Sequence, residues 1–400
     1  MKTLIIGGGI AGSSLAFALR RAGREAVVAE ARGSQRDTGG AFLYLAPNGV
    51  NALAAIGLGD APAAAGGFEA YGLDFHNARG RKIAELAGEQ DLARYGARGV
   101  VLRRARLHAE VAQRAQAAGA TFLFNARLVE LRTVPQGVEA VFADGRTLIA
   151  DAVIGADGIW STVRRLTWPE APRPSYTGMV DCGSWTEVDL PDTARQQMYF
   201  GHRAFFGYTV NDKVAYWFTN VPRHDEPGRY ELADLDQGDW IASIRRLHEL
   251  DPAPVQAILN AARHTLGAWP LYDMPTVDAW HDEGVCLVGD AAHAVSPSTG
   301  QGASLAIEDA AVLARWMQHE TRPGAAFAGF TEERKVRTEK IACFGRQLGD
   351  RKVSSAAGNV FRDLTLPMFL RMGAKATAEQ YGYRVPTPPA LRAPREKAHE

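Results

Sequence analysis

The first thirty residues restrict the fold more than any other stretch of this chain. Residues 4–6 are a short apolar run typical of a strand buried on both faces, and residues 13–21 have the apolar periodicity of a helix. Residues 26–29 form a second apolar run. Glycines with G-x-G-x-x-G spacing join the first run to the helix, and they are Gly7, Gly9 and Gly12. This order predicts the strand–turn–helix–strand unit of an α/β fold.

The glycine turn and Glu30 together indicate a dinucleotide site. One glycine permits the tight turn, one lets the backbone approach a pyrophosphate, and one lets the helix pack closely on the strand. The helix N-terminus then offers unpaired N–H groups and a partial positive charge to the phosphates. Glu30 ends the second strand, where it can accept hydrogen bonds from an adenosine ribose. Arg32 either contacts the adenosine side or is a solvated surface arginine.

Composition narrows the class of protein. The 400 residues carry a formal net charge of zero without a basic run, which argues against nucleic acid or an anionic membrane as a partner. The three cysteines are far apart and form no C-x-x-C pair, so neither a disulfide framework nor a thiolate metal site is expected. No apolar run approaches the roughly 20 residues of a bilayer crossing, and the first apolar run is too interrupted for a signal peptide. We therefore expect a cytoplasmic protein.

A second informative stretch covers residues 151–165, which read DAVIGADGIWSTVRR. Residues 152–154 predict a buried strand, residues 155–158 a glycine turn, and Ser161 the start of a helix. The turn carries Asp157, whose carboxylate is either a ligand contact or a local cap of that helix.

A third stretch covers residues 285–314. Residues 285–288 predict a buried strand with Asp290 at its carboxyl end, where ligands bind in open α/β sheets. A loop follows, and then a long helix from Ala303; the loop residues able to approach a ligand are Pro297, Gly300 and Gly302. We expect His293 to be structural, and Glu308-Asp309 to be packing and hydrogen-bonding partners of this loop.

The remaining patterns outline the other elements. Residues 176–220 are rich in aromatic side chains and predict a sheet, either packed over something large and flat or simply an aromatic core. We also expect helices at residues 49–56, 104–118, 235–247 and 254–262, a hairpin at 67–86, strands at 100–102, 122–131 and 138–142, helices from 323, and a disordered tail from 384.

Taken together, the three stretches resemble the triple signature of the FAD-dependent aromatic hydroxylases, the 4-hydroxybenzoate hydroxylase-like (group A) flavin monooxygenases. The residues that carry the resemblance are Gly7-Gly8-Gly9-Ile10-Ala11-Gly12, Asp157-Gly158 and Gly289-Asp290. The segments Pro47-Asn48 and Arg104-Ala105-Arg106-Leu107 match the family in order. The chain lacks a large C-terminal addition, which makes it similar to smaller members such as tetracycline-modifying monooxygenases.

The resemblance implies a site for FAD. The glycine turn and Glu30 would hold its ADP half, Arg104 would reach the phosphate or ribityl region, and Val129 would lie against the adenine. Asp157, supported by Arg164, would contribute to both FAD and nicotinamide-cofactor binding. Asp290 would hydrogen-bond the ribityl chain, and the loop with Pro297, Gly300 and Gly302 would face the isoalloxazine.

The resemblance also implies the reaction. In this family NAD(P)H reduces FAD, O2 adds to give a flavin C4a-hydroperoxide, and one oxygen passes to an electron-rich substrate. This chain would then hydroxylate or epoxidise an aromatic or polyketide-like small molecule. A positioned Tyr or His would activate a phenol, and the candidates are Tyr199 first, then His202 and Tyr216. Tyr199 and His202 would face opposite sides of one strand, so both cannot line one pocket without a bulge.

The expected fold is α/β, with a Rossmann-like (GR2-type) FAD-binding domain, an inserted mixed β-sheet substrate domain and C-terminal helices. We assign the FAD-binding domain to residues 1–75, 101–170 and 271–325, a substrate-domain hairpin to 76–100 and the substrate sheet to 171–270. Residues 326–383 would be the C-terminal helices and 384–400 a disordered tail. The sequence leaves the oligomeric state and the choice between NADH and NADPH open.

Two other functions share such a nucleotide domain. One is a flavoprotein whose FAD is only a template, such as a cyclase acting on a natural product, since function resides in the site and not the fold. The other is a flavin halogenase, which the absence of a Trp-x-Trp-x-Ile-Pro segment argues against.

Overall fold

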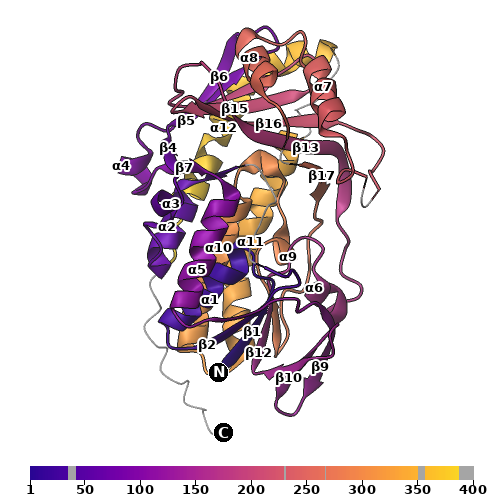
Figure 1. Ribbon diagram of the computed structural model, residues 1–400. Coiled ribbons are helices and arrows are strands. Elements are labelled where there is room, and N and C mark those ends of the chain that lie inside the picture. Colours follow the sequence, from indigo (N-terminus) through magenta and orange to yellow (C-terminus); the bar gives the residue numbers. More distant parts are fainter. Residues whose placement is uncertain (35–41, 229–230, 266, 350–355, 387–400) are drawn as a thin grey trace.

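A computed structural model describes residues 1–34, 42–228, 231–265, 267–349 and 356–386, except for the side chains of residues 298, 346–349, 356–362 and 371–372. The molecule is built around two large sheets (Figure 1). The lower one in that view is a five-stranded parallel sheet with the order β18-β12-β1-β2-β8. Its strands are β1 (Lys2–Ile6), β2 (Glu25–Ala29), β8 (Thr121–Leu123), β12 (Ala152–Gly155) and β18 (Val285–Leu287).

Continuous apolar runs form this sheet because helices cover it. Leu4, Ile5 and Val28 are at most 1% exposed. The helix that follows the glycine turn is α1 (Ile10–Arg21). It packs against two other helices, α5 (Arg104–Ala117) and α10 (Gly302–His319). The predicted strand–turn–helix–strand unit is therefore confirmed, as are the strands predicted at residues 152–154 and 285–288.

One predicted strand is wrong. Residues 122–131 divide between β8, which ends at Leu123, and β9 (Leu128–Val134), which belongs to a separate antiparallel sheet. Asn125 has a φ of 55°, and the amide of Ala126 donates to the carbonyl of Glu30, so the chain turns away from the parallel sheet. The separate sheet contains β9, β10 (Gly137–Phe142) and β11 (Thr147–Ala150), with the predicted turn at residues 144–145 between the last two.

The upper sheet in Figure 1 is seven-stranded and mixed, with the order β17-β13-β16-β15-β14-β5-β6. Only the β14–β5 pair is parallel. The strands are β5 (Gly72–His76), β6 (Lys82–Ala87), β13 (Ser175–Glu187), β14 (Gln196–Phe200), β15 (Phe205–Asn211), β16 (Val214–Pro222) and β17 (Ala268–Asp273). One face packs on α7 (Gln237–Leu247) and α8 (Ala253–Ala261) through a core that includes Phe206 and Trp217.

Short elements connect the two sheets. A three-stranded sheet contains β3 (Leu43–Leu45), β7 (Gly99–Leu102) and β4 (Phe68–Ala70). The short helices are α2 (Pro47–Ile56), α3 (Ala61–Ala64), α4 (Asp91–Tyr95), α6 (Thr162–Thr167), α9 (Asp290–His293) and the 3-10 turn η1 (Pro297–Thr299).

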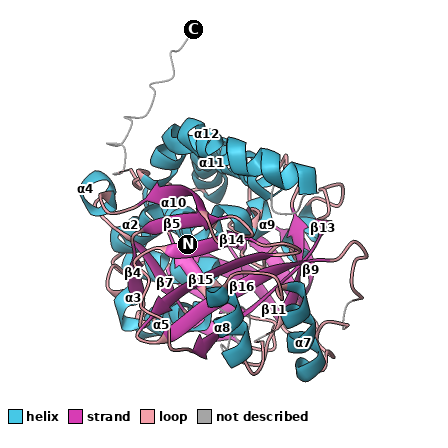
Figure 2. Cartoon of the chain, turned by 90° about the horizontal axis from the view of Figure 1, so that it is seen from above, coloured by secondary structure: helices cyan, strands magenta, loops and turns pink. Residues whose placement is uncertain are grey.

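Two long helices, α11 (Pro323–Gly349) and α12 (Ala356–Tyr381), lie together along one side of the molecule (Figure 2). They contact different parts of the fold: α11 packs on α10 and η1, whereas α12 packs on β6. Within the described residues, no helix combines the length and apolar character that a bilayer crossing requires. The predicted tail lies mostly outside the described residues.

This architecture confirms the predicted α/β class with an inserted mixed sheet and C-terminal helices. The domain limits stay a prediction.

Candidate functional site

The glycine turn after β1 is shaped by close contact with the loop after β12. Gly7 has a φ of 104°, and a Cβ on it would collide with the carbonyl oxygen of Ala156. A Cβ on Gly12 would collide with the carbonyl oxygen of Gly7. These two glycines are thus required by packing, as the sequence pattern predicts.

Gly9 differs from its neighbours because a Cβ there would meet no atom within 4 Å. Gly9 is also the N-cap of α1, and no side chain caps the helix. The unpaired N–H groups at the start of α1 therefore face space beside Gly9, an arrangement that suits a phosphate. The residues of this turn fit the pyrophosphate of a dinucleotide.

The Glu30 carboxylate lies beside the turn. Its Oε2 accepts a hydrogen bond from the Gly8 amide at 2.9 Å, and its Oε1 accepts one from the Arg32 amide at 2.9 Å. These bonds orient the carboxylate at the carboxyl end of β2. Arg32, Arg104 and Val129 are exposed. Their contact with a cofactor stays a prediction.

Asp157 caps α6. Its Oδ1 accepts from the Ser161 hydroxyl at 2.5 Å, and its Oδ2 accepts from the Thr162 and Val163 amides at 2.7 and 3.1 Å. Burial raises the pKa of this carboxyl, while the hydrogen bonds oppose the shift. Arg164 is also engaged internally, since its guanidinium donates to the carbonyl of Ala291 at 2.6 Å. Of the two roles that the sequence left open for Asp157, the structure shows the cap; a cofactor contact stays a prediction.

The turn after β18 reaches solvent only at Asp290. Gly289 has a φ of 58°, and Asp290, the first residue of α9, is exposed. Beyond α9, η1 begins at Pro297, Gly300 has a φ of 61°, and α10 begins at Gly302. The segment 297–302 thus connects two helices and ends at the N-terminus of α10.

A buried network of charges supports this segment. Asp309 accepts from the Gly289 amide at 2.8 Å, from Arg334 at 2.7 Å, and lies 2.6 Å from His293 Nε2. Burial alone would raise the pKa of Asp309, but His293 and Arg334 lower it to about 2.

Glu308 extends the network to the neighbouring helices. It pairs with Arg334 at 2.6 Å and Arg337 at 2.9 Å, and it accepts from Asn48 at 2.7 Å. Asn48 also donates to Gln301, inside the segment, at 2.8 Å. The prediction that His293 and Glu308-Asp309 are structural partners of the loop is confirmed.

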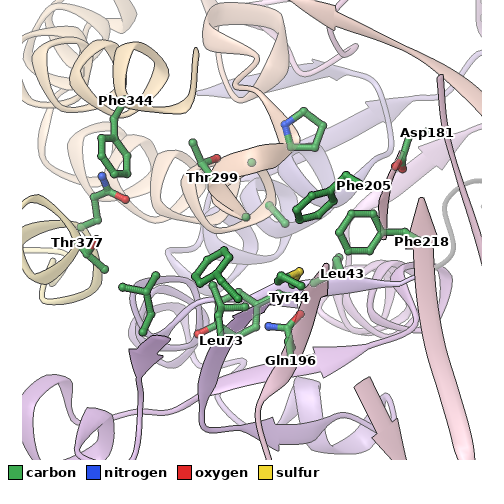
Figure 3. A pocket seen from close by; sticks show the side chains of 18 of the residues that line it. Leu43, Tyr44, Leu73, Asp181, Gln196, Phe205, Phe218, Thr299, Phe344 and Thr377 are labelled. Atoms are coloured by element: carbon green, nitrogen blue, oxygen red, sulfur yellow. The ribbon is translucent and has the colours of Figure 1, made fainter. Parts of the chain in front are cut away.

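A cavity of about 370 Å³ lies against segment 297–302, between the mixed sheet and the C-terminal helices (Figure 3). Rings dominate its wall, and these are Phe42, Tyr44, Phe75, Phe200, Phe205, Phe218, Trp269, Phe344 and Tyr381. The polar lining side chains besides the tyrosines are Asp181, Gln196, Thr299, Thr377 and Gln380. Asp181 and Phe218 lie at one end of the cavity, and Phe344 and Thr377 lie at the other. Apolar side chains therefore make up most of the wall.

A second cavity of about 560 Å³ adjoins the first. It lies between the β5–β6 hairpin and α12, and the two cavities share Tyr44, Leu73, Leu86, Leu370, Thr377 and Tyr381. Its lining includes charged residues, among them Lys82 and Arg94. The pair of cavities therefore forms an apolar chamber with a more polar annex.

The three residues predicted as catalytic do not line the first cavity. Tyr199 belongs to the core under α7 and α8, where its ring stacks on His76 at 4.5 Å. His202 pairs with Asp251 at 3.0 Å. Tyr216 is nearest, since its ring contacts the lining residue Phe42 at 6.0 Å. Their roles stay predictions that the cavity does not support.

Sequence reasoning missed the lining residues of β14. Gln196, Met198 and Phe200 face the cavity, so Tyr199 between them faces the opposite side of the sheet. The alternation of the strand was the available signal, but it does not say which face meets the cofactor. The lining residues from α11 and α12 had no local signal at all.

Comparison with known proteins gives consistent matches along most of the chain. The sequence pattern of the family described as "FAD binding domain" matches residues 1–344. The chain is 31% identical to the aurachin C monooxygenase/isomerase of Stigmatella aurantiaca, over 87% of this chain and 89% of that protein. It is 30% identical to the 3-amino-4-hydroxybenzoate 2-monooxygenase of Streptomyces cremeus, over 88% of this chain and 87% of that protein.

Among solved structures, Klebsiella pneumoniae HpxO complexed with FAD and uric acid shares the fold with a TM-score of 0.82 and 24% identity. The match covers 95% of this chain and 96% of that one.

Proposed function

Since this chain belongs to the family of FAD-dependent aromatic monooxygenases, we propose that it uses NAD(P)H and O2 to hydroxylate or epoxidise an aromatic or polyketide-like small molecule. The observation that carries the proposal is the position of the ring-lined cavity directly against segment 297–302, which follows the turn of Asp290 and α9 in the chain. A cyclase with a templating FAD is the weaker alternative, because the matched relatives are monooxygenases.

The cofactor residues have separate tasks in this proposal. The N–H groups at the start of α1 bind the pyrophosphate, Glu30 accepts from the ribose, and Asp290 accepts from the ribityl chain. Segment 297–302 presents the isoalloxazine to the cavity. Bound FAD supplies the activation of O2, which no amino-acid side chain provides.

The protein's own contribution is a dry, oriented chamber. Water must be excluded so that the activated oxygen reaches the substrate, and the apolar wall serves this purpose. Burial raises the pKa of Tyr44 and raises that of Tyr381 to about 12, so both phenols stay neutral at physiological pH. They can orient a substrate by hydrogen bonds, but they are poor bases.

A cytoplasmic location fits this chemistry. NAD(P)H is available there, and the free cysteines Cys182, Cys286 and Cys343 stay reduced.

The test is FAD content followed by turnover. The purified protein is expected to be yellow and to consume NAD(P)H faster when an acceptable aromatic compound is added under air. Product formed under ¹⁸O₂ should carry one heavy oxygen atom. Conversion of a substrate without NAD(P)H consumption or label would favour the cyclase and reject the monooxygenase.

A further inference from the structure

We propose that the cavity accepts uncharged aromatic compounds and rejects carboxylates, and that Gln196 is one of the polar residues that recognise them. The inference rests on the proposed monooxygenase function for the identity of the site. It adds the class of substrate and a specificity-determining residue.

The first line of support is the charge of the wall. Among the lining residues that the structure describes there is no Arg, Lys or His, and Asp181 is the only ionisable carboxylate. A substrate carboxylate in this chamber would lose its hydration without gaining a cationic partner, which is strongly unfavourable. The arginines that flank the aromatic strands are paired with carboxylates outside the cavity lining: Arg195 with Glu85 at 2.7 Å, Arg203 with Glu249 at 3.0 Å, and Arg223 with Glu231.

The second line of support is the state of the polar lining groups. Thr299 donates to the carbonyl of Ser296 at 2.9 Å, and Asp181 accepts from Asn220 at 2.6 Å, so both are already held by the protein. Gln196 is only 3% exposed, and its side chain points into the cavity (Figure 3). No described residue hydrogen-bonds to its amide group.

This amide opens onto the cavity, so a bound ligand can supply the hydrogen-bond partner that the described residues do not. The amide offers both an N–H donor and a carbonyl acceptor, so it matches a ring edge that carries a neutral hydroxyl, carbonyl or N–H group. Its neighbour Gln197 shows the contrast. That side chain faces the opposite side of β14 and already bonds His76 at 2.8 Å and the carbonyl of Arg195 at 3.0 Å.

The experiment compares two ligands that differ by one group, 4-hydroxyquinoline and 4-hydroxyquinoline-2-carboxylate. Binding to the FAD-loaded protein is measured by calorimetry and by quenching of tryptophan fluorescence, since Trp269 lines the cavity. We expect the uncharged compound to bind at least about 10-fold more tightly, because burying an unpaired carboxylate costs more than the tenfold equivalent of affinity. Equal or tighter binding of the carboxylate, or binding of neither compound up to its solubility, would overturn the proposal.

Variants then isolate Gln196. Gln196→Met keeps the volume and removes the amide, and it should weaken 4-hydroxyquinoline by about 10-fold while leaving naphthalene binding unchanged. Gln197→Met is the matched control and should change the affinity for neither 4-hydroxyquinoline nor naphthalene. Gln196→Arg introduces a cation and should reverse the preference toward the carboxylate. If Gln196→Met does not fold, Gln196→Asn shortens the side chain by one methylene and should show the same loss of affinity for 4-hydroxyquinoline. Unchanged affinity in a folded variant would refute the role of Gln196.

The binding readout separates this inference from the proposed function. A protein that discriminates the two ligands but never consumes NAD(P)H would reject the monooxygenase and keep the selectivity. A protein that turns over carboxylates and uncharged compounds alike would support the monooxygenase function and reject the selectivity.

Discussion

Gly9 and Gly12 share one turn, but their surroundings are opposite. Gly12 has a backbone oxygen against it, whereas the space beside Gly9 is open. A side chain at Gly12 therefore disturbs the fold, and a side chain at Gly9 disturbs only what binds there.

The first prediction follows from this difference. Gly9→Ala should leave the thermal unfolding temperature close to that of the wild type but weaken FAD binding by at least about 10-fold, because the methyl group occupies the place of the pyrophosphate. Gly12→Ala should be poorly folded. FAD fluorescence titration and circular dichroism measure the two effects, and a Gly9→Ala protein with full FAD affinity would refute the phosphate site.

The second prediction concerns pH and Asp91, which is 5% exposed at the start of α4. Burial raises its pKa to about 6, although the charge of Arg94 opposes the shift. The folded state therefore binds the proton more strongly than the unfolded state, whose Asp pKa is about 4. Stability should fall as the pH rises from about 4 to about 6 and stay lower above that.

Asp91→Asn removes the free-energy cost of keeping an ionised carboxylate buried. The variant should be more stable than the wild type above about pH 6, by about 1–2 kcal/mol, and equal to it below about pH 4. Urea unfolding at the two pH values measures the difference. A variant that is less stable at both would show that the ionised carboxylate is favourable in the fold.

Individual side-chain roles were only partly readable from the sequence. Glu30 could be placed because its position depends on a local pattern of strand and turn. The side chain of Tyr199 could not be placed, because its direction depends on which face of β14 packs against the helices α7 and α8. Asp157 is intermediate: its helix was visible, but its three hydrogen bonds to that helix became evident only in the structure.

At the scale of elements, the helices α9, α10 and α11 are joined through charges instead of apolar contacts alone. His293 belongs to α9, Glu308 and Asp309 to α10, and Arg334 to α11. Burial alone would lower the pKa of Arg334, but the neighbouring carboxylates of Glu308 and Asp309 raise it, so the guanidinium stays charged. Removing one partner leaves an uncompensated charge in the core.

The third prediction is that Asp309→Asn lowers the free energy of unfolding by about 3 kcal/mol. The backbone amide of Gly289 keeps an acceptor, but Arg334 and His293 lose a charged partner. Glu339→Gln, on α11 with Arg334, is the control, because its pair with Lys335 is long, at 3.8 Å, and only partly buried. It should change stability by less than about 0.5 kcal/mol. Denaturant unfolding followed by fluorescence compares the two, and equal effects would contradict the importance of the buried network.

Element positions were largely predictable where the pattern was local. The helix at residues 49–56 and the hairpin turn at 144–145 appear as expected, because a glycine or proline marks each end. The failure at residues 122–131 has a non-local cause. The carbonyls of Glu30 and Arg32, about ninety residues earlier, accept hydrogen bonds from residues 125 and 126 and thereby end β8.

At the scale of the whole molecule, two cavities with a shared wall lie where the mixed sheet meets α12. The larger one opens between the β5–β6 hairpin and the helix. We expect it to be the route by which substrates reach the inner chamber.

The fourth prediction tests this route. Ala374 lines only the outer cavity, so Ala374→Trp should narrow it and lower kcat/KM for a bulky polycyclic substrate by about 10-fold, which corresponds to about 1.4 kcal/mol. A single-ring substrate should be affected much less. Ala378→Trp, on the same helix but outside both linings, is the control. Equal losses for both substrates would indicate a distorted helix instead of a blocked route.

The residues that line the chamber could not be foreseen from the sequence. Its wall brings together residues as distant as Phe42, Gln196 and Phe344, which have no common pattern. The three cofactor segments could be foreseen, because each combines a buried strand with a glycine turn.

The strand order of the parallel sheet also determines when the nascent chain can complete this sheet during synthesis. β1 lies beside β12, which in turn lies beside β18, so neighbours in the sheet leave the ribosome far apart in time. At about 5–20 residues per second, on the order of tens of seconds separate the first strand from the last. During that interval β1 and β2 expose apolar edges that only later segments can cover. The nascent polypeptide should therefore depend on chaperones until the turn after β18 has emerged. FAD, a derivative of the vitamin riboflavin, should bind only after that point.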